Sequence, residues 1–203
     1  MSPTRFFAGA VSLALTVSVL TACATAPETG RSQVLLVSTA EEARMGFKAF
    51  EQLKQKKPQV RGGSDWQALQ RVGRRIAAVT RLPHAQWEFV LFKDDETANA
   101  FALPGGKVGV YTGMLPVTLN EAGLATVIGH EVAHAVARHG AERLSHSLLI
   151  EIGGAALSAA LGSASGTTRD LAMQAYGIGS SLGVALPYSR TQELEADRLG
   201  LLY

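Results

Sequence analysis

The chain has 203 residues, of which 47% are hydrophobic and 18% are charged, and its formal net charge is +2. This size and composition predict one globular domain with a real core and exclude a mainly disordered chain. The near-neutral charge provides no basic face for nucleic acid, so no nucleic-acid partner is expected. Cys23 is the only cysteine, which excludes an internal disulfide.

The N-terminal residues resemble a bacterial lipoprotein signal. Phe6–Leu20 is an apolar run of signal-peptide length and is too short to span a membrane comfortably. The next residues, Leu20-Thr21-Ala22-Cys23, resemble a lipobox, which implies cleavage before Cys23 and its acylation. We therefore expect a signal peptide over residues 1–22 and a lipid anchor at Cys23. The alternatives are an ordinary signal with a chance cysteine, or an uncleaved anchor.

The sorting rule of such lipoproteins depends on the residue after the cysteine, which is Ala24 and not Asp. It favours the outer membrane, with the protein facing the periplasm. Residues 24–33 are small and polar, and residues 23–38 are expected to form a tether. Residues 39–203 are expected to form the folded domain.

Two helices and three strands are predicted before residue 113. A capping-box pattern, Thr39 with Glu42, starts a helix that runs to about Lys57, and a second helix spans about residues 64–80. Residues 87–92, 98–103 and 107–112 are strands by composition, and Pro104-Gly105-Gly106 is a tight turn. The expected fold class is α+β, mostly helical, with a small antiparallel sheet before the next helix.

That next helix carries His130-Glu131-Val132-Ala133-His134, after a candidate N-cap at Asn120. The two histidines are four residues apart, so their side chains lie on one face of the helix, about one turn from each other. Both can bind one zinc ion, and Glu131 lies where it can take a proton from water at the metal. The alternative is two histidines and a glutamate that are satisfied by hydrogen bonds in a core.

A catalytic zinc usually has three protein ligands, so one is missing from this pair. His139 lies about 180° around a continuous helix from His130 and is not expected to be the third. His84 and His146 also lack suitable spacing. Glu193 and Asp197 are four residues apart on one face of a last helix, where Glu193 can be a ligand and Asp197 can orient a histidine. A solvated acidic patch is the alternative for this pair.

Residues 148–186 are rich in Gly, Ala, Ser and Leu. We expect two small-residue helices packed over the site, or a mobile lid, rather than a pair of membrane helices. The chain stops at Tyr203 within the last predicted helix, which suggests that a C-terminal portion is missing.

Three ordered segments resemble one protein family: NAFALPGGKVGVYTGML, HEVAHAVARH and SRTQELEAD. They are similar to the HtpX- and CAAX-prenyl-protease-type gluzincin zinc metallopeptidases, with a zincin-like domain. The lipobox adds a likeness to their periplasmic lipoprotein branch of BepA- and LoiP-like proteases. The resemblance implies one zinc per chain held by His130, His134 and Glu193, with Glu131 as the base and Asp197 behind the ligands. It also implies substrate contacts from three residues, Asn99, Ala100 and Arg190.

The expected function is zinc-dependent hydrolysis of misfolded or stalled envelope proteins at the periplasmic face of the outer membrane. The partners are then unfolded envelope polypeptides and, through Cys23, the membrane. One alternative is a chaperone-like assembly factor for outer-membrane proteins that cleaves rarely or never. Another is a structural zinc protein, which requires a fourth protein ligand.

Overall fold

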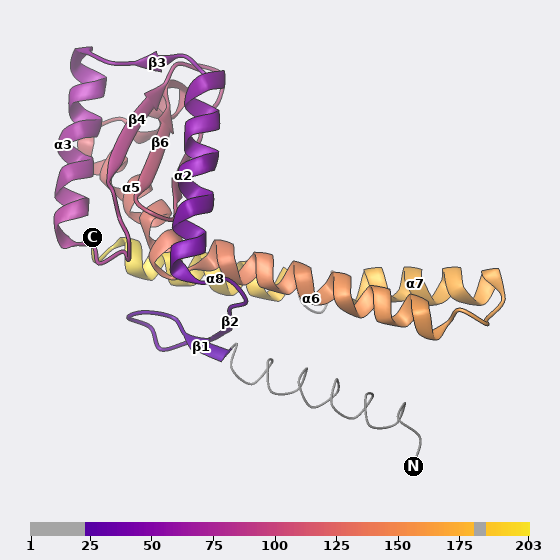
Figure 1. Ribbon diagram of the computed structural model, residues 1–203. Helices are drawn as coiled ribbons and strands as arrows, with labels where there is room; N and C mark the ends of the chain where they lie inside the picture. The colour runs from indigo at the N-terminus through magenta and orange to yellow at the C-terminus, as the bar shows by residue number, and fades with distance from the viewer. Residues whose placement is uncertain (1–22, 181–185) are drawn as a thin grey trace.

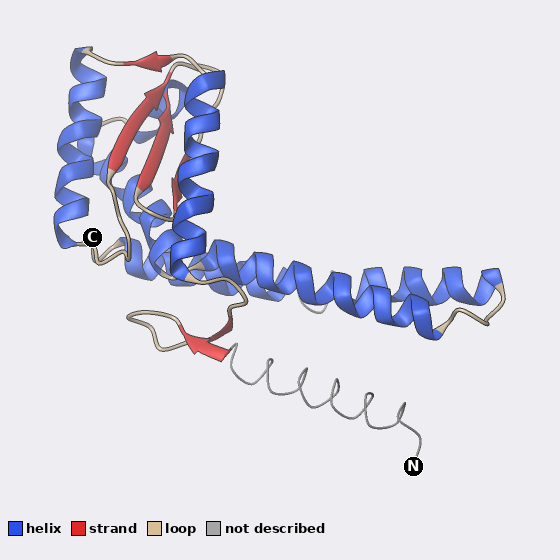
Figure 2. Cartoon of the chain, viewed as in Figure 1, coloured by secondary structure: helices blue, strands red, loops and turns tan. Residues whose placement is uncertain are grey.

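The computed structural model describes residues 23–180 and 186–203 (Figures 1 and 2). The predicted signal peptide, residues 1–22, lies outside the described residues. The mostly helical α+β class is confirmed. The helices are α2 (Thr39–Lys56), α3 (Gly63–Val79), α4 (Leu115–Thr118), α5 (Glu121–Val136), α6 (His139–Ala160), α7 (Gly166–Ser180) and α8 (Leu186–Gly200), with a short 3-10 helix, η1 (Thr112–Met114). The strands are β1 (Cys23–Thr25), β2 (Ser32–Val34), β3 (Gln59–Val60), β4 (Glu88–Phe92), β5 (Ala100–Leu103) and β6 (Lys107–Tyr111).

Polar side chains cap the helices that matter most for the site. The Asn120 side chain accepts hydrogen bonds from the amides of Ala122 and Gly123, both at 3.0 Å, and so begins α5 where the sequence predicts. The N-cap of α2 lies one residue before the predicted cap, because Ser38 rather than Thr39 accepts from a backbone amide, that of Glu41 at 3.2 Å.

The main sheet has the strand order β3-β4-β6-β5 and is mixed. The prediction of a wholly antiparallel sheet is therefore wrong in one respect: β4 and β6 run parallel, with Glu88 opposite Lys107. The reason is that β5 and β6 form the predicted hairpin, and it is β6 of this hairpin that pairs with β4. Strand β5 becomes the edge of the sheet, which a meander of β4, β5 and β6 would not allow. Gly105 and Gly106, at φ +85° and +80°, make the hairpin turn as expected.

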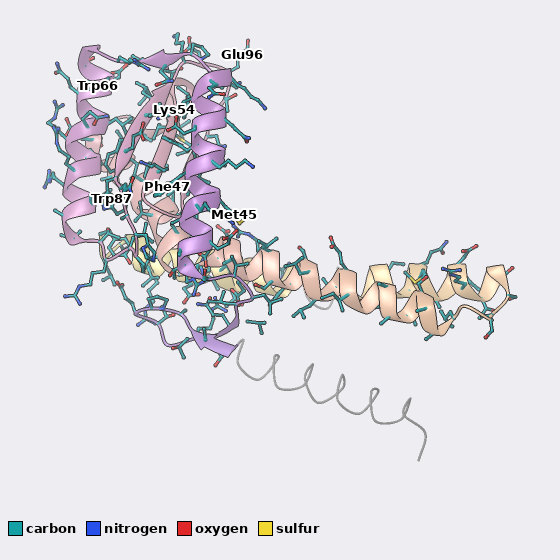
Figure 3. All side chains as sticks on the ribbon, in the orientation of Figure 1. Met45, Phe47, Lys54, Trp66, Trp87 and Glu96 are labelled. Carbon is teal, nitrogen blue, oxygen red and sulfur yellow. The ribbon has the colours of Figure 1, made fainter. Side chains whose placement is uncertain are left out.

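Side chains that alternate along the strands divide the core into two layers. Phe89 and Leu91 of β4 pack with α3 and α5, whereas Val90 and Phe92 pack with Phe50 of α2. Helix α2 therefore covers one face of the sheet, and α3 and α5 cover the other. Figure 3 shows Phe47 and Lys54 on the side of α2 that faces the strands. This sandwich fixes α5, the helix that carries the histidine pair.

The segment expected to be a tether is structured in part. Strands β1 and β2 form an antiparallel hairpin, with Cys23 opposite Val34. Hydrogen bonds join this N-terminal hairpin to α6 and α8, through Arg31 to Glu142 and to Glu195. The chain after it is also held, because the amide of Leu36 donates to the hydroxyl of Ser145.

Helices α6 and α7 form a long antiparallel pair that projects from the sandwich (Figure 1). The two predicted helices exist, but the pair extends away from the sheet instead of covering α5. The hydroxyl of Tyr176 ties α7 to α6 by donating to the carbonyl of Ile150. None of the helices in the described ranges combines the length and apolarity that a membrane crossing requires.

Candidate metal centre and active site

Helices α5 and α8 bring three predicted ligands together. The Nε2 atoms of His130 and His134 are 3.1 Å apart. Oε2 of Glu193 lies 3.3 Å from Nε2 of His130, and Oε1 of Glu193 lies 3.6 Å from Nε2 of His134. One donor atom from each residue lies within 4.8 Å of the others. Residues that are far apart in the chain thus form one donor cluster.

The chemistry of this cluster fits zinc. Asp197 Oδ1 lies 2.9 Å from Nδ1 of His130, and a carboxylate at that distance holds the imidazole proton on Nδ1. The Nε2 of His130 then presents a lone pair to the cluster. Two imidazole nitrogens and a carboxylate are the donor types of a catalytic zinc site that keeps one position open. Zinc is therefore the cofactor that this site holds.

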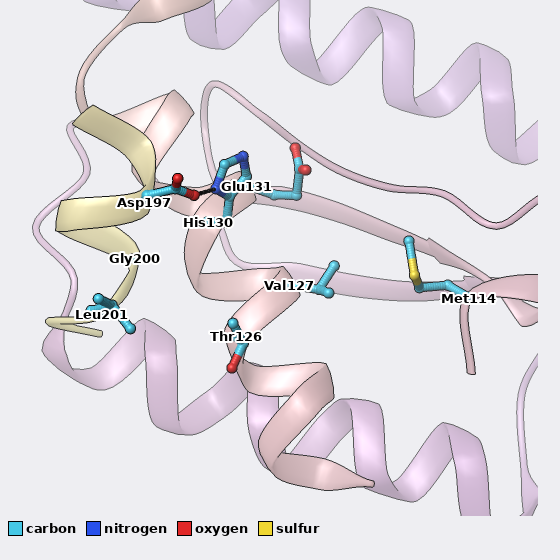
Figure 4. Close-up of a pocket in the computed structure, with 8 residues that line it drawn as sticks. All are labelled: Met114, Thr126, Val127, His130, Glu131, Asp197, Gly200 and Leu201. Atoms are coloured by element: carbon cyan, nitrogen blue, oxygen red, sulfur yellow. Dashed lines mark hydrogen bonds and ion pairs between the residues drawn. The ribbon is translucent and has the colours of Figure 1, made fainter. Parts of the chain in front are cut away.

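Glu131 lies beside the cluster at an open cavity of about 610 Å³. Figure 4 shows Glu131 and His130 side by side on α5, with Asp197 reaching His130 from α8. Burial raises the pKa of the Glu131 carboxyl, and His130 opposes this only in part. A base whose pKa is raised towards neutrality can both take and return a proton. The cavity is lined by Met114, Thr126, Val127, His130, Glu131, Asp197, Gly200 and Leu201.

His139 is not a member of the donor cluster, as predicted, but the geometry differs from the prediction. Helix α5 ends at Val136, and Arg138 takes a left-handed conformation at φ 62°. The chain turns there, and His139 becomes the first residue of α6, fully buried, with its Nδ1 2.8 Å from Nδ1 of His134. Burial and the neighbouring His139 lower the pKa of His134, so its imidazole is neutral at neutral pH, as a metal ligand must be.

A close crossing of two glycines holds α5 against α8. A Cβ on Gly200 would lie 2.8 Å from the backbone nitrogen of His130, and a Cβ on Gly129 would lie 2.7 Å from the carbonyl oxygen of Gly200. Only glycine allows the two backbones to approach this closely. The crossing sets the distance from which Glu193 and Asp197 reach His130.

Gly200→Ala is expected to separate the two helices and weaken zinc binding. The added methyl group meets backbone atoms, which have no free rotamer, so α8 must move at a cost of about 1–3 kcal/mol. The measurements are thermal unfolding and zinc affinity by chelator competition. Gly177→Ala on α7 is the control, because its new methyl group has open space. Unchanged zinc affinity in Gly200→Ala would contradict the role of the crossing.

The predicted substrate residues lie outside the donor cluster. Asn99 precedes β5, where its carbonyl accepts from the amide of Tyr111 at 3.0 Å, and Ala100 is buried at the start of the strand. Arg190 is exposed on α8, three residues before Glu193. The contacts of His139 with His134 and Glu195, and the crossing of the two glycines, were not expected from the sequence. Neither the turn at Arg138 nor the glycine crossing has a local sequence signal.

The three donors, with Glu131 beside them at an open cavity, have the composition of a catalytic zinc site. The chain belongs to peptidase family M48, whose family model matches residues 64–203. This confirms the family resemblance seen in the sequence.

Two groups of relatives are similar to the chain. The mitochondrial metalloendopeptidase OMA1 of Schizosaccharomyces pombe is 41% identical over 132 residues, which is 65% of this chain and 36% of that protein. OMA1 of Homo sapiens is 37% identical over 54% of this chain and 21% of its own length. The beta-barrel assembly-enhancing protease of Escherichia coli K12 is 29% identical, but over 87% of this chain and 37% of that protein. The chain thus spans at most about 37% of each of these relatives.

Identity is therefore higher to OMA1 than to the beta-barrel assembly-enhancing protease, whereas the match to the latter is longer. Membership of peptidase family M48 is therefore confirmed, and the branch within the family is a proposal.

Proposed function

We propose that this chain is a zinc-dependent endopeptidase that cleaves misfolded or stalled envelope proteins at the periplasmic face of the outer membrane. The observation that carries the activity is the convergence of His130, His134 and Glu193 beside Glu131 at an open cavity. Two observations support the location: the lipobox-like sequence at Cys23, and the similarity to an Escherichia coli protein named for enhancing beta-barrel assembly. Two acyl chains or more at Cys23 would anchor the protein stably.

The chain's own residues account for proton transfer and orientation. When zinc is bound, it supplies a Lewis acid that polarises the peptide carbonyl and makes water more acidic. Glu131 takes a proton from the attacking water and returns it to the leaving amine. Asp197 holds the proton of His130 on Nδ1, so that Nε2 stays available to the cluster. Burial raises the pKa of the Glu131 carboxyl, which favours its holding a proton between the two transfers.

The edge of the sheet can hold a peptide in extended form. Strand β5 pairs with β6 on one side and packs near α5, and within residues 23–180 and 186–203 it has no second strand partner. An unpaired edge offers backbone amides and carbonyls to an added strand. Asn99 and Ala100 at the start of β5 would align the substrate, and Arg190 would contact it from α8. Only an unfolded substrate can present an extended segment to this edge, which agrees with misfolded proteins as substrates.

Cleavage of an outer-membrane porin tests this function. The purified zinc-loaded protein is expected to cut a urea-unfolded porin after dilution, and to spare the same porin folded in detergent, because only the unfolded chain can add to β5. The readout is the appearance of fragments on a gel over time. Stable binding of the unfolded porin without cleavage would favour the assembly-factor alternative. Equal cleavage of both forms would contradict the proposed selectivity.

A further inference from the structure

A hydrogen-bonded chain runs from the ligand His134 through a second histidine to a buried carboxylate. Nδ1 of His134 lies 2.8 Å from Nδ1 of His139, and Nε2 of His139 lies 3.0 Å from Oε2 of Glu195. His139 is fully buried and Glu195 nearly so. None of these contacts belongs to the donor cluster itself, and the proposed chemistry does not use them.

The order of protons along this chain follows from its ends. The Glu195 carboxylate only accepts, so Nε2 of His139 carries a proton. Nδ1 of His139 must be unprotonated when His134 binds a metal. A proton on that atom would force the proton of His134 onto Nε2, the nitrogen that faces Glu193. Nδ1 of His134 then donates to Nδ1 of His139, and Nε2 of His134 presents its lone pair to the cluster.

We propose that His139 is a positioning residue, which fixes the ring orientation and tautomer of His134, and that Arg31 of the N-terminal hairpin holds Glu195 for this purpose. His130 is held differently, by the exposed carboxylate of Asp197. The two zinc-binding histidines thus depend on different supports, one solvent-facing and one buried.

Arg31 is built into this support. Its Nε donates to Oε2 of Glu195 at 2.7 Å, and its two terminal nitrogens donate to the Glu142 carboxylate at 2.7 and 2.8 Å. The hydroxyl of Thr29, on the same hairpin, also bonds Glu195. Glu195 therefore accepts hydrogen bonds from Thr29 and Arg31 of the hairpin and from His139. The hairpin lies before residue 64, where the family match begins.

Other polar groups around Arg31 complete the same layer between α6 and α8. Gln192 donates to Glu142 at 2.8 Å, and Arg143 donates to Gln192 at 2.9 Å. These bonds satisfy Glu142 and the residue beside the ligand Glu193, but they do not reach His139. Within the described residues, His139 contacts two polar side chains, those of His134 and Glu195.

Two substitutions of His139 test the first part. His139→Phe keeps a ring but removes the acceptor, and it is expected to weaken zinc binding about 10–100-fold, the usual effect of losing an outer partner of a ligand. His139→Asn can place an amide oxygen near the former Nδ1 and should bind zinc within a few fold of the wild-type protein. Zinc affinity is measured by chelator competition without substrate, and the cobalt-substituted protein is compared by its visible spectrum.

A structural role alone would lower the thermal stability of both variants without separating their zinc affinities. Wild-type affinity in His139→Phe, or equal loss in both variants, would overturn the proposal. Because the readout is metal binding, its failure is distinct from an absence of proteolysis.

Arg31→Met tests the second part, with Lys54→Met as the matched control. Both cations bridge two carboxylates and have similar exposure, 20% for Arg31 and 19% for Lys54, but Lys54 bonds Glu51 and Glu88, away from the zinc site. We expect Arg31→Met to weaken zinc binding about tenfold and Lys54→Met to leave it unchanged. Equal zinc affinities in the two variants would overturn the role of Arg31, whatever their stabilities.

Discussion

Glu131→Gln is expected to abolish measurable cleavage of unfolded casein while one zinc per chain remains bound. Glutamine fills the same space but cannot take a proton, and the loss of a general base lowers rates by roughly 10²–10⁴-fold. The donor atoms of His130, His134 and Glu193 are untouched, so zinc content should not fall. The measurements are a casein-cleavage assay and metal analysis of the same preparation.

Full activity in the Glu131→Gln protein would refute the assignment of the base. The same variant separates the two candidate functions in cells. If it rescues an envelope-stress defect, then binding and not cleavage carries the function, and the assembly-factor alternative holds. If it fails to rescue while it accumulates at the wild-type level, then proteolysis is required.

Glu193→Ala is expected to lower the zinc content well below one ion per chain. The proteolytic activity should fall with the zinc content. The carboxylate supplies the third donor, within 3.3 Å and 3.6 Å of the two imidazoles. Losing a direct ligand should cost more than the 10–100-fold loss that follows removal of an outer partner. Zinc content is measured by metal analysis after dialysis.

Glu151→Ala is a control for the Glu193 substitution, because it removes an exposed carboxylate on α6, outside the donor cluster. It should keep wild-type zinc content and activity. Unchanged zinc stoichiometry in Glu193→Ala would remove that residue from the ligand set and leave His130 and His134 as an incomplete site.

The metal cluster could be read from the sequence because its parts have fixed local spacing. His130 and His134 share a face by helical geometry, and Glu193 and Asp197 do so by the same rule. Their meeting in space was not implied by spacing and came from the family resemblance. The close crossing that makes it possible depends on Gly129 and Gly200, which carry no local signal of a tertiary contact.

Two features of the fold could not be read from local pattern. Strand composition predicts the strands but not their order, so the parallel pairing of β4 and β6 was missed. His139 would lie opposite His130 only on a continuous helix, whereas α5 ends at Val136 and α6 begins at His139. Arg138, between the two helices, takes a left-handed conformation that arginine rarely adopts, and its side chain bonds Glu42 and the carbonyl of Val37. The turn at Arg138 is therefore associated with tertiary contacts, which the local sequence does not predict.

The N-terminal hairpin also determines where the minimal folding unit begins. Glu142 and Glu195 both contact Arg31, so a protein cut at residue 64 would keep two buried carboxylates and lose their shared cation. Removing one partner of a buried ion pair costs about 3–5 kcal/mol, a large part of the 5–15 kcal/mol that stabilises a typical domain. The unit suitable for expression thus starts before the N-terminal hairpin, earlier than residue 64, where the family model begins to match.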